Sequence, residues 1–115
     1  MTPAAEGARG AAGAVTPIFA ALGDPTRRSI VELLVTRGQA TATELSAQLQ
    51  ISRQAVSKHL LQLSEVGLTV SQRSGRENRY QLDAKPLSAV TEWVAEVEQQ
   101  WNQRLLRLQS SLEAD

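Results

Sequence analysis

The side chains best suited to chemistry in this sequence lie close together in the segment 52–58. This segment reads SRQAVSK and offers a guanidinium, a carboxamide, two hydroxyls and an ammonium. Apolar residues follow at helical spacing at Val56, Leu60 and Leu63, so the segment belongs to a helix with one buried side. The polar side chains fill an arc of about 140° that runs away from that side. From a helix laid in the major groove, such groups can reach base edges and phosphates. The residues on this arc are Arg53, Gln54, Ser57, Lys58 and Leu61, and Ser52 is the expected N-cap.

Two short helices joined by a tight turn must position this arc. The N-terminal helix of this pair has a capping box, Thr41 with Glu44, ahead of its apolar residues. Only Ile51 and Ser52 separate it from the helix that bears the arc, which Gly67 closes. So close a pair of short helices indicates a helix-turn-helix.

Two further helices are expected upstream. Residues 17–22 form a short apolar helix that ends at Gly23. In the next helix Asp24 is a good N-cap and Pro25 stands at the first helical position, where its missing N–H costs nothing. Gly38 ends that helix.

A basic hairpin follows the helix-turn-helix. Residues 68–82 alternate in polarity on both sides of the loop RSGRE, as expected for two strands and a short turn. Arg73, Arg76 and Arg79 surround its tip. An isolated polar helix face is more often simply solvated, but a tight helix pair beside a basic hairpin matches a winged helix. In that arrangement the hairpin reaches the backbone or the minor groove of DNA, and we therefore favour DNA binding.

The last segment, Pro86 to about Leu112, is expected to be one long helix with a single apolar stripe. The stripe either folds back on its own domain or packs against a second copy. A helix of this length spans about 39 Å, more than one small domain can cover, so we predict a homodimer. Trp93 lies off the stripe and is expected to pack against the first helix. The predicted interface comprises Phe19, Leu22, Leu87, Val90, Val94, Val97, Trp101, Leu105 and Leu108.

The composition limits which other functions the chain can have. The 115 residues suit one domain and contain no cysteine, which excludes disulfides and thiolate sites and suits a cytoplasmic protein. The single histidine, His59, lies about 160° from Ser57 on the helical wheel, so we expect a structural role for it. Alone it cannot build a zinc site. We expect neither an enzyme, nor a metal or other cofactor, nor a membrane span, nor order in the tail 1–16.

Charge is unevenly distributed although the net charge is zero. Residues 52–81 hold five basic side chains against two acidic ones, whereas residues 83–115 hold three against six. Basic charge therefore gathers where DNA binding is predicted.

With these motifs, the chain resembles ArsR-type winged-helix transcriptional repressors. The resemblance covers about Ile18 to Leu82 and rests on ALGDPTRRSIVELL, TELSAQLQISRQAVSKHLLQL and GLTVSQRSGRENRYQL, in the family's order and spacing. It implies a mainly α fold of about five helices and a two-stranded wing, with a winged helix-turn-helix DNA-binding domain in 17–84 and a C-terminal dimerisation helix, part of the same domain, in 85–112. It further implies a homodimer that represses transcription from an imperfect palindrome near its own promoter.

The sequence departs from the family's metal sensors. Some of those proteins have cysteines on the helix before the recognition helix, where this chain reads ELSAQL. Others have His and acidic residues on the last helix, where this chain has glutamates but no His. It therefore resembles the metal-independent branch, with an unknown effector. Leu61 stands where Lys or Arg is common in the family, so the resemblance implies that one phosphate contact is either missing or replaced by a thymine-methyl contact. The alternative from another class is a protein-interaction module of the same fold, which should show no salt-dependent affinity for DNA.

Overall fold

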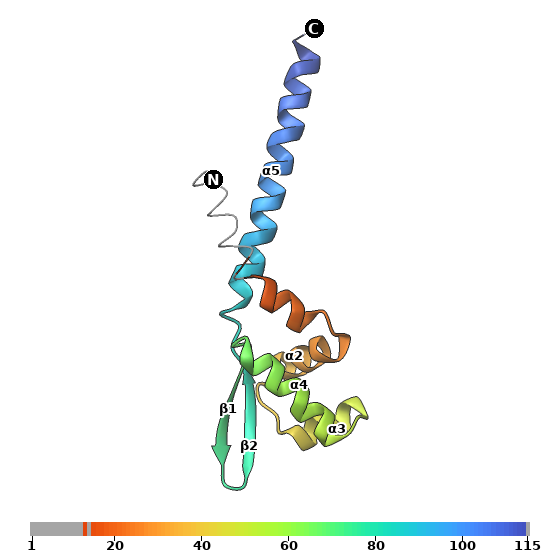
Figure 1. Cartoon of the computed structure of the whole chain (residues 1–115), viewed down its shortest axis with the longest axis vertical. Coiled ribbons are helices and arrows are strands. Elements are labelled where there is room, and N and C mark those ends of the chain that lie inside the picture. The colour runs from red at the N-terminus through yellow and green to blue at the C-terminus, as the bar shows by residue number, and fades with distance from the viewer. Residues whose placement is uncertain (1–12, 14, 115) are drawn as a thin grey trace.

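A helical domain, a hairpin and one projecting helix make up the chain (Figure 1). The computed structural model describes residues 13 and 15–114. Within these residues the chain forms five helices and a two-stranded antiparallel hairpin, as the sequence predicts. Residues 15–22 form a helix, which we call the first helix. The later elements are α2 (Pro25–Arg37), α3 (Ala42–Leu49), α4 (Arg53–Glu65), β1 (Thr69–Ser74), β2 (Glu77–Leu82) and α5 (Leu87–Glu113).

The predicted caps fix the helix boundaries. The Asp24 side chain accepts from the Arg27 N–H at the start of α2, and Pro25 is the first helical residue. Thr41 and Glu44 form the capping box of α3, and the Ser52 side chain accepts from the Ala55 N–H at the start of α4. These local hydrogen bonds satisfy N–H groups that have no partner inside the helix.

The turn between α3 and α4 is built without glycine. Gln50 caps α3 in the left-handed conformation, with φ of 57°. The Ser46 hydroxyl donates to the carbonyl oxygen of Ile51, which fixes the chain just beyond that turn. The two helices therefore keep the tight connection expected of a helix-turn-helix.

One hydrophobic core joins the helices to the base of the hairpin. Its fully buried large side chains come from α2, α3, α4 and the residue before β1: Ile30, Leu34, Leu45, Val56, Leu60, Leu63 and Leu68. Ile18 and Ala21 of the first helix complete it. Leu22, Leu87 and Val90, which the sequence assigned to a dimer interface, are partly buried against this core of their own chain.

The hairpin is fastened to the helical domain. β1 and β2 pair in register from Thr69 opposite Leu82 to Ser74 opposite Glu77. A further antiparallel bridge joins Tyr80 of β2 to Ala40, in the segment between α2 and α3. The hairpin thus points away from the body at a fixed place beside the helix-turn-helix (Figure 1).

α5 leaves the domain and continues alone. None of its residues is buried, and every residue from Thr91 to Ala114 is exposed. The molecule measures 71 × 29 × 20 Å, with a radius of gyration of 19.6 Å, against about 13 Å for a compact chain of this length. Within residues 13 and 15–114, no helix combines the length and apolarity that a membrane span requires.

Most of the predicted tail, 1–16, lies outside the described residues. At its end, however, Val15 and Thr16 are already helical, and Val15 is buried. The ordered domain therefore begins before the predicted boundary, because Val15 provides an apolar side chain for the core.

Candidate nucleic-acid interface

α4 presents the predicted polar arc to solvent. Val56, Leu60 and Leu63 are buried, whereas Arg53, Gln54, Ser57, Lys58 and Leu61 are exposed. We refer to these five exposed residues as the reading face. Leu61 is 60% exposed. Among the described residues, no hydrogen bond or ion pair engages the side chains of Arg53, Gln54, Ser57 or Lys58.

Ser52 has a different role from the rest of the predicted set. Its hydroxyl accepts from the Ala55 N–H at 3.1 Å and so fixes where α4 begins. As a donor the same hydroxyl is still available. Ser52 therefore positions Arg53 and Gln54 at the first turn of α4, where the helix N-terminus also favours an anion.

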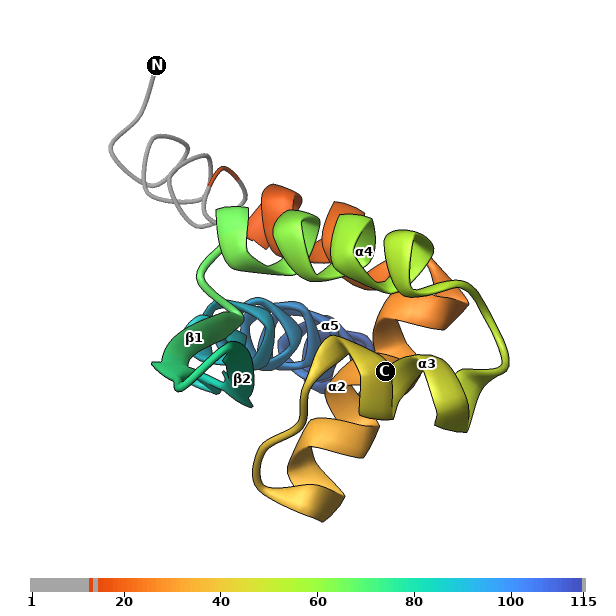
Figure 2. The same cartoon turned by 90° about the horizontal axis from the view of Figure 1, so that it is seen from below.

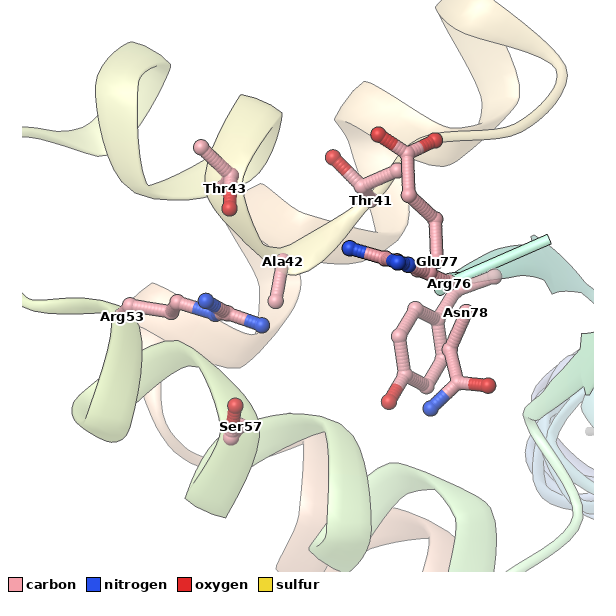
Figure 3. Close-up of a pocket in the computed structure, with 9 residues that line it drawn as sticks. Thr41, Ala42, Thr43, Arg53, Ser57, Arg76, Glu77 and Asn78 are labelled. Atoms are coloured by element: carbon pink, nitrogen blue, oxygen red, sulfur yellow. The ribbon is translucent and has the colours of Figure 1, made fainter. Parts of the chain in front are cut away.

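The reading face and the hairpin meet at a common hollow of about 160 Å³ (Figure 3). Arg53 and Ser57 extend into it from α4 and Arg76 from the tip of the hairpin, while the start of α3 closes another side. The guanidiniums of Arg53 and Arg76 have no acidic partner within the described chain. Glu77 also lines this hollow, but its carboxylate contacts Arg79, so two unpaired cations on two elements remain beside the hollow and suit a phosphate backbone.

Arg73 and Arg79 line a second hollow, of about 260 Å³, with Gln39, Gln72 and Ser74. Arg79 is opposite Gln72 in the hairpin register, and its guanidinium contacts the Glu77 carboxylate at 3.3 Å. The Arg73 Nε donates to the Gly75 carbonyl oxygen, also at 3.3 Å. The three predicted hairpin arginines are therefore divided between two hollows, and only Arg76 joins the reading face.

Sequence reasoning missed several residues at these surfaces. Thr43 and Asn78 line the first hollow and Gln39 lines the second. Asn78 is opposite Arg73 in the hairpin. The alternation of strand side chains indicated its face, but only the position of the hairpin relative to α3 brings it near Arg53 and Thr43.

Two carboxylates support the helices that position the interface. A hydrogen bond from the Arg27 backbone N–H, with the nearby Arg27 charge, lowers the pKa of Asp24. The Thr41 N–H, then the Thr41 hydroxyl and the Arg37 guanidinium lower the pKa of Glu44. Arg37 contacts Glu44 at 2.7 Å, which ties the end of α2 to the start of α3.

His59 lies on the side of α4 that faces the first helix, away from the reading face. Its Nδ1 lies 3.5 Å from Nη1 of Arg27, and Gln62 accepts from the same Nη1 at 2.7 Å. The predicted structural role of His59 is therefore confirmed.

The remaining residues predicted at the dimer interface are exposed along α5. Val94, Val97, Trp101, Leu105 and Leu108 are between 40% and 56% exposed. Trp93 packs on the first helix as predicted, since its ring meets Phe19 edge to face with centroids 5.3 Å apart. Phe19 therefore contacts α5 of its own chain, although 40% of it stays exposed.

Known proteins share this architecture and sequence. A family model described as a helix-turn-helix domain matches residues 22–72. The chain is 41% identical over 76 residues to YuzN of Bacillus subtilis, named an uncharacterized HTH-type transcriptional regulator, across 61% of this chain and 83% of that protein. It is 32% identical over 77 residues to the transcriptional repressor SdpR of the same organism, across 67% of this chain and 84% of that protein.

A solved structure extends the likeness to three dimensions. An ArsR-like transcriptional regulator from Rhodococcus superimposes with a TM-score of 0.76 at 34% identity, covering 88% of this chain and 94% of that one. The shared winged helix includes α4 and the hairpin, on which the interface is built. The chain belongs to the ArsR family of helix-turn-helix transcriptional regulators.

Proposed function

We propose that this chain is a dimeric repressor that binds an imperfect palindrome in promoter DNA, including its own promoter. α4 enters the major groove with its reading face, and the hairpin lies against the adjacent backbone or minor groove. One observation supports this most directly. The side chains of Arg53, Gln54, Ser57 and Lys58 are exposed and unpartnered within the described chain, and Arg76 faces the same hollow as Arg53.

This surface offers two kinds of contact with DNA, one with base edges and one with phosphates. Arg53 and Gln54 have the bidentate groups that read guanine and adenine in the major groove. The Lys58 ammonium is a compact charge and the Arg76 guanidinium is a planar fork of donors, and both suit contacts with phosphates. Leu61 offers an apolar contact for a thymine methyl group. The operator is therefore read by α4, while the hairpin adds affinity that depends little on sequence.

We propose that the second copy covers α5. The α5 stripe, which we define as Leu87, Val90, Val94, Val97, Trp101, Leu105, Leu108 and Leu112, spans almost the whole helix, and only its first two members reach the core. Apolar stripes of this length are rare on isolated soluble domains. A two-fold pairing of identical stripes buries them and places two α4 helices for successive major grooves, roughly 34–36 Å apart.

Release from DNA does not use a cysteine-based metal site. The sequence contains no cysteine, and residues 13 and 15–114 include no cluster of three or more His, Cys, Asp and Glu side chains able to hold a metal ion. Soft metal ions select thiolates, which are absent here. We propose that the chain belongs to the metal-independent branch of the family and acts in the cytoplasm.

Fluorescence anisotropy tests this function. A labelled duplex from upstream of the chain's own gene is titrated at two salt concentrations, with a scrambled duplex as control. We expect tight, salt-sensitive binding that prefers the native duplex. Equal, weak binding to both duplexes would contradict autoregulation, and the absence of any salt-dependent binding would favour a protein-interaction module instead.

A further inference from the structure

One guanidinium connects the first helix to the rear of the recognition helix α4. Nε of Arg27 donates to the carbonyl oxygen of Ala21, and Nη2 donates to that of Ala20 at 3.2 Å. On the other side, Nη1 donates to Gln62 Oε1 at 2.7 Å and lies 3.5 Å from His59 Nδ1. Arg27 itself belongs to α2. Three helices therefore meet at a single side chain.

The acceptors on both sides are suited to this contact. The carbonyls of Ala20 and Ala21 lie in the last turn of a helix whose final residue is Leu22, where carbonyl groups lack partners within the helix. A cation is also favoured there by the helix dipole. His59 and Gln62 are about 140–160° around α4 from Ser57, so the contact leaves the reading face free.

An open hollow lies at this junction. Pro17, Ala20 and Ala21 face Gln62 and Val66 across a hollow of about 260 Å³, which Arg27 also lines. Val15, Ile18 and Ala21 bury the inner side of the first helix, but apolar contact is non-directional and does not by itself set the angle between two helices. The directional hydrogen bonds of Arg27 therefore fix the angle between the first helix and α4.

That angle matters because the first helix also contacts α5. Phe19, which directly precedes the Arg27 acceptors Ala20 and Ala21, meets Trp93 of α5 edge to face. In Figure 2 the first helix, in red, and α4, in green, lie side by side, with α5 beyond them. A continuous path thus runs from α5 through the first helix and Arg27 to α4.

We propose that Arg27 is a positioning residue that sets the angle of α4 relative to the dimerising helices and so selects the spacing of the two operator half-sites. The proposal rests on the dimeric, DNA-binding function above. In a two-fold dimer, a rotation of each α4 changes the separation of the two reading faces. Half-sites must match that separation, because both helices enter grooves on one face of the duplex.

The test uses Arg27→Lys, which keeps the charge but loses the fork, and Gln62→Leu, which removes the acceptor on α4. Arg28→Lys is the matched control, because Arg28 donates to the Leu22 carbonyl oxygen and forms no hydrogen bond or ion pair with α4 within the described residues. Anisotropy is measured on the footprinted operator and on duplexes whose half-sites are one base pair closer or farther apart. For the unaltered protein we expect both altered spacings to weaken binding by about tenfold or more, because contacts in one half-site are lost.

We expect Arg27→Lys and Gln62→Leu to bind the native spacing more weakly but to discriminate among spacings by only about threefold, a difference of ~0.7 kcal/mol. Arg28→Lys should retain the full discrimination. Equal weakening at every spacing, with the ratio unchanged, would overturn the proposal, because it would mean that Arg27 supports only stability.

A second measurement needs no DNA. A cysteine introduced by Ser64→Cys on α4 gives one spin-label site per chain, because the sequence has no cysteine. Pulsed electron resonance should show one narrow label-to-label distance in the unaltered dimer and a broader or shifted distribution with Arg27→Lys or Gln62→Leu. Identical distributions, or no intermolecular distance at all, would overturn the proposal. A clear effect here with no selective DNA binding would support the role of Arg27 in setting the angle of α4, but would contradict the proposed function and, with it, the selection of half-site spacing.

Discussion

Ala40 and Tyr80 exchange two backbone hydrogen bonds. The Ala40 N–H donates to the Tyr80 carbonyl oxygen at 3.0 Å, and the Tyr80 N–H donates to the Ala40 carbonyl oxygen at 2.8 Å. Ala40 directly precedes Thr41, the N-cap of α3, so the hairpin is joined to the start of the helix-turn-helix. This bridge explains why Arg76 and Asn78 of the hairpin lie beside Arg53.

The bridge predicts a pattern of amide hydrogen exchange. We expect the amides of Ala40 and Tyr80 to exchange much more slowly than that of Gly75 at the hairpin tip, because both are hydrogen-bonded and Ala40 is fully buried. Exchange measured by NMR at each residue provides the check. Comparable rates at Tyr80 and Gly75 would mean that the hairpin moves independently of the helices.

Arg76 and Arg79 should differ in their effect on DNA binding. Arg76 is unpaired within the described residues and faces the hollow beside α4, whereas Arg79 contacts Glu77 and lines the other hollow. We expect Arg76→Ala to weaken binding to all sequences and to reduce the salt slope by ~0.9, the value for one phosphate contact. Arg79→Ala should change the slope less. Anisotropy over a series of salt concentrations measures both, and a larger change for Arg79→Ala would reverse the assignment of the two hollows.

Substitutions at the start of α4 should alter specificity rather than general affinity. Gln54→Ala and Arg53→Ala should each relax the preference at particular base pairs, by about 1–3 kcal/mol for each good bidentate contact. Binding to a panel of duplexes with single base changes provides the measurement. Uniform weakening over the whole panel would show that these side chains contact only phosphates.

Local signals in the sequence specified most of the fold. Asp24, Thr41 with Glu44, and Ser52 are caps that act within three residues, so their positions could be identified without knowing the tertiary structure. The reading face was likewise predictable, because Val56, Leu60 and Leu63 define the buried side of α4 by periodicity alone.

Long-range placement was not predictable in the same way. The α5 stripe is continuous in sequence, but Leu87 and Val90 pack on their own domain, because the first turns of α5 start beside the core. Arg73, Arg76 and Arg79 looked equivalent around one tip. Their division between two hollows depends on the hairpin register and on the bridge to Ala40, which joins segments far apart in the sequence.

α5 offers a matched pair of leucines for testing the dimer. Leu105 belongs to the α5 stripe and Leu106 lies roughly 100° away around the helix, although Leu106 is the more exposed, at 63% against 45%. We expect Leu105→Glu to raise the dimer dissociation constant by about 30-fold or more, the size of an interface hot spot, because a charge would be buried between the helices. Leu106→Glu should leave association nearly unchanged. Sedimentation velocity over a range of concentrations distinguishes the two, and equal effects would show that the stripe is not the interface.

Acidification should weaken the start of α3 through Glu44. The hydrogen bonds of Glu44 with Thr41 and Arg37 hold the pKa of its carboxyl below the ordinary value, so the folded state binds this proton less readily than the unfolded chain. Its contribution to stability is therefore fully present above the unfolded pKa, near 4.3, and is lost as the pH falls through the lower folded pKa. Thermal midpoints measured between pH 7 and pH 3 should fall less steeply for Glu44→Gln than for the unaltered chain, because the amide has no proton to bind. Parallel curves for the two proteins would show that the capping box does not couple folding to pH.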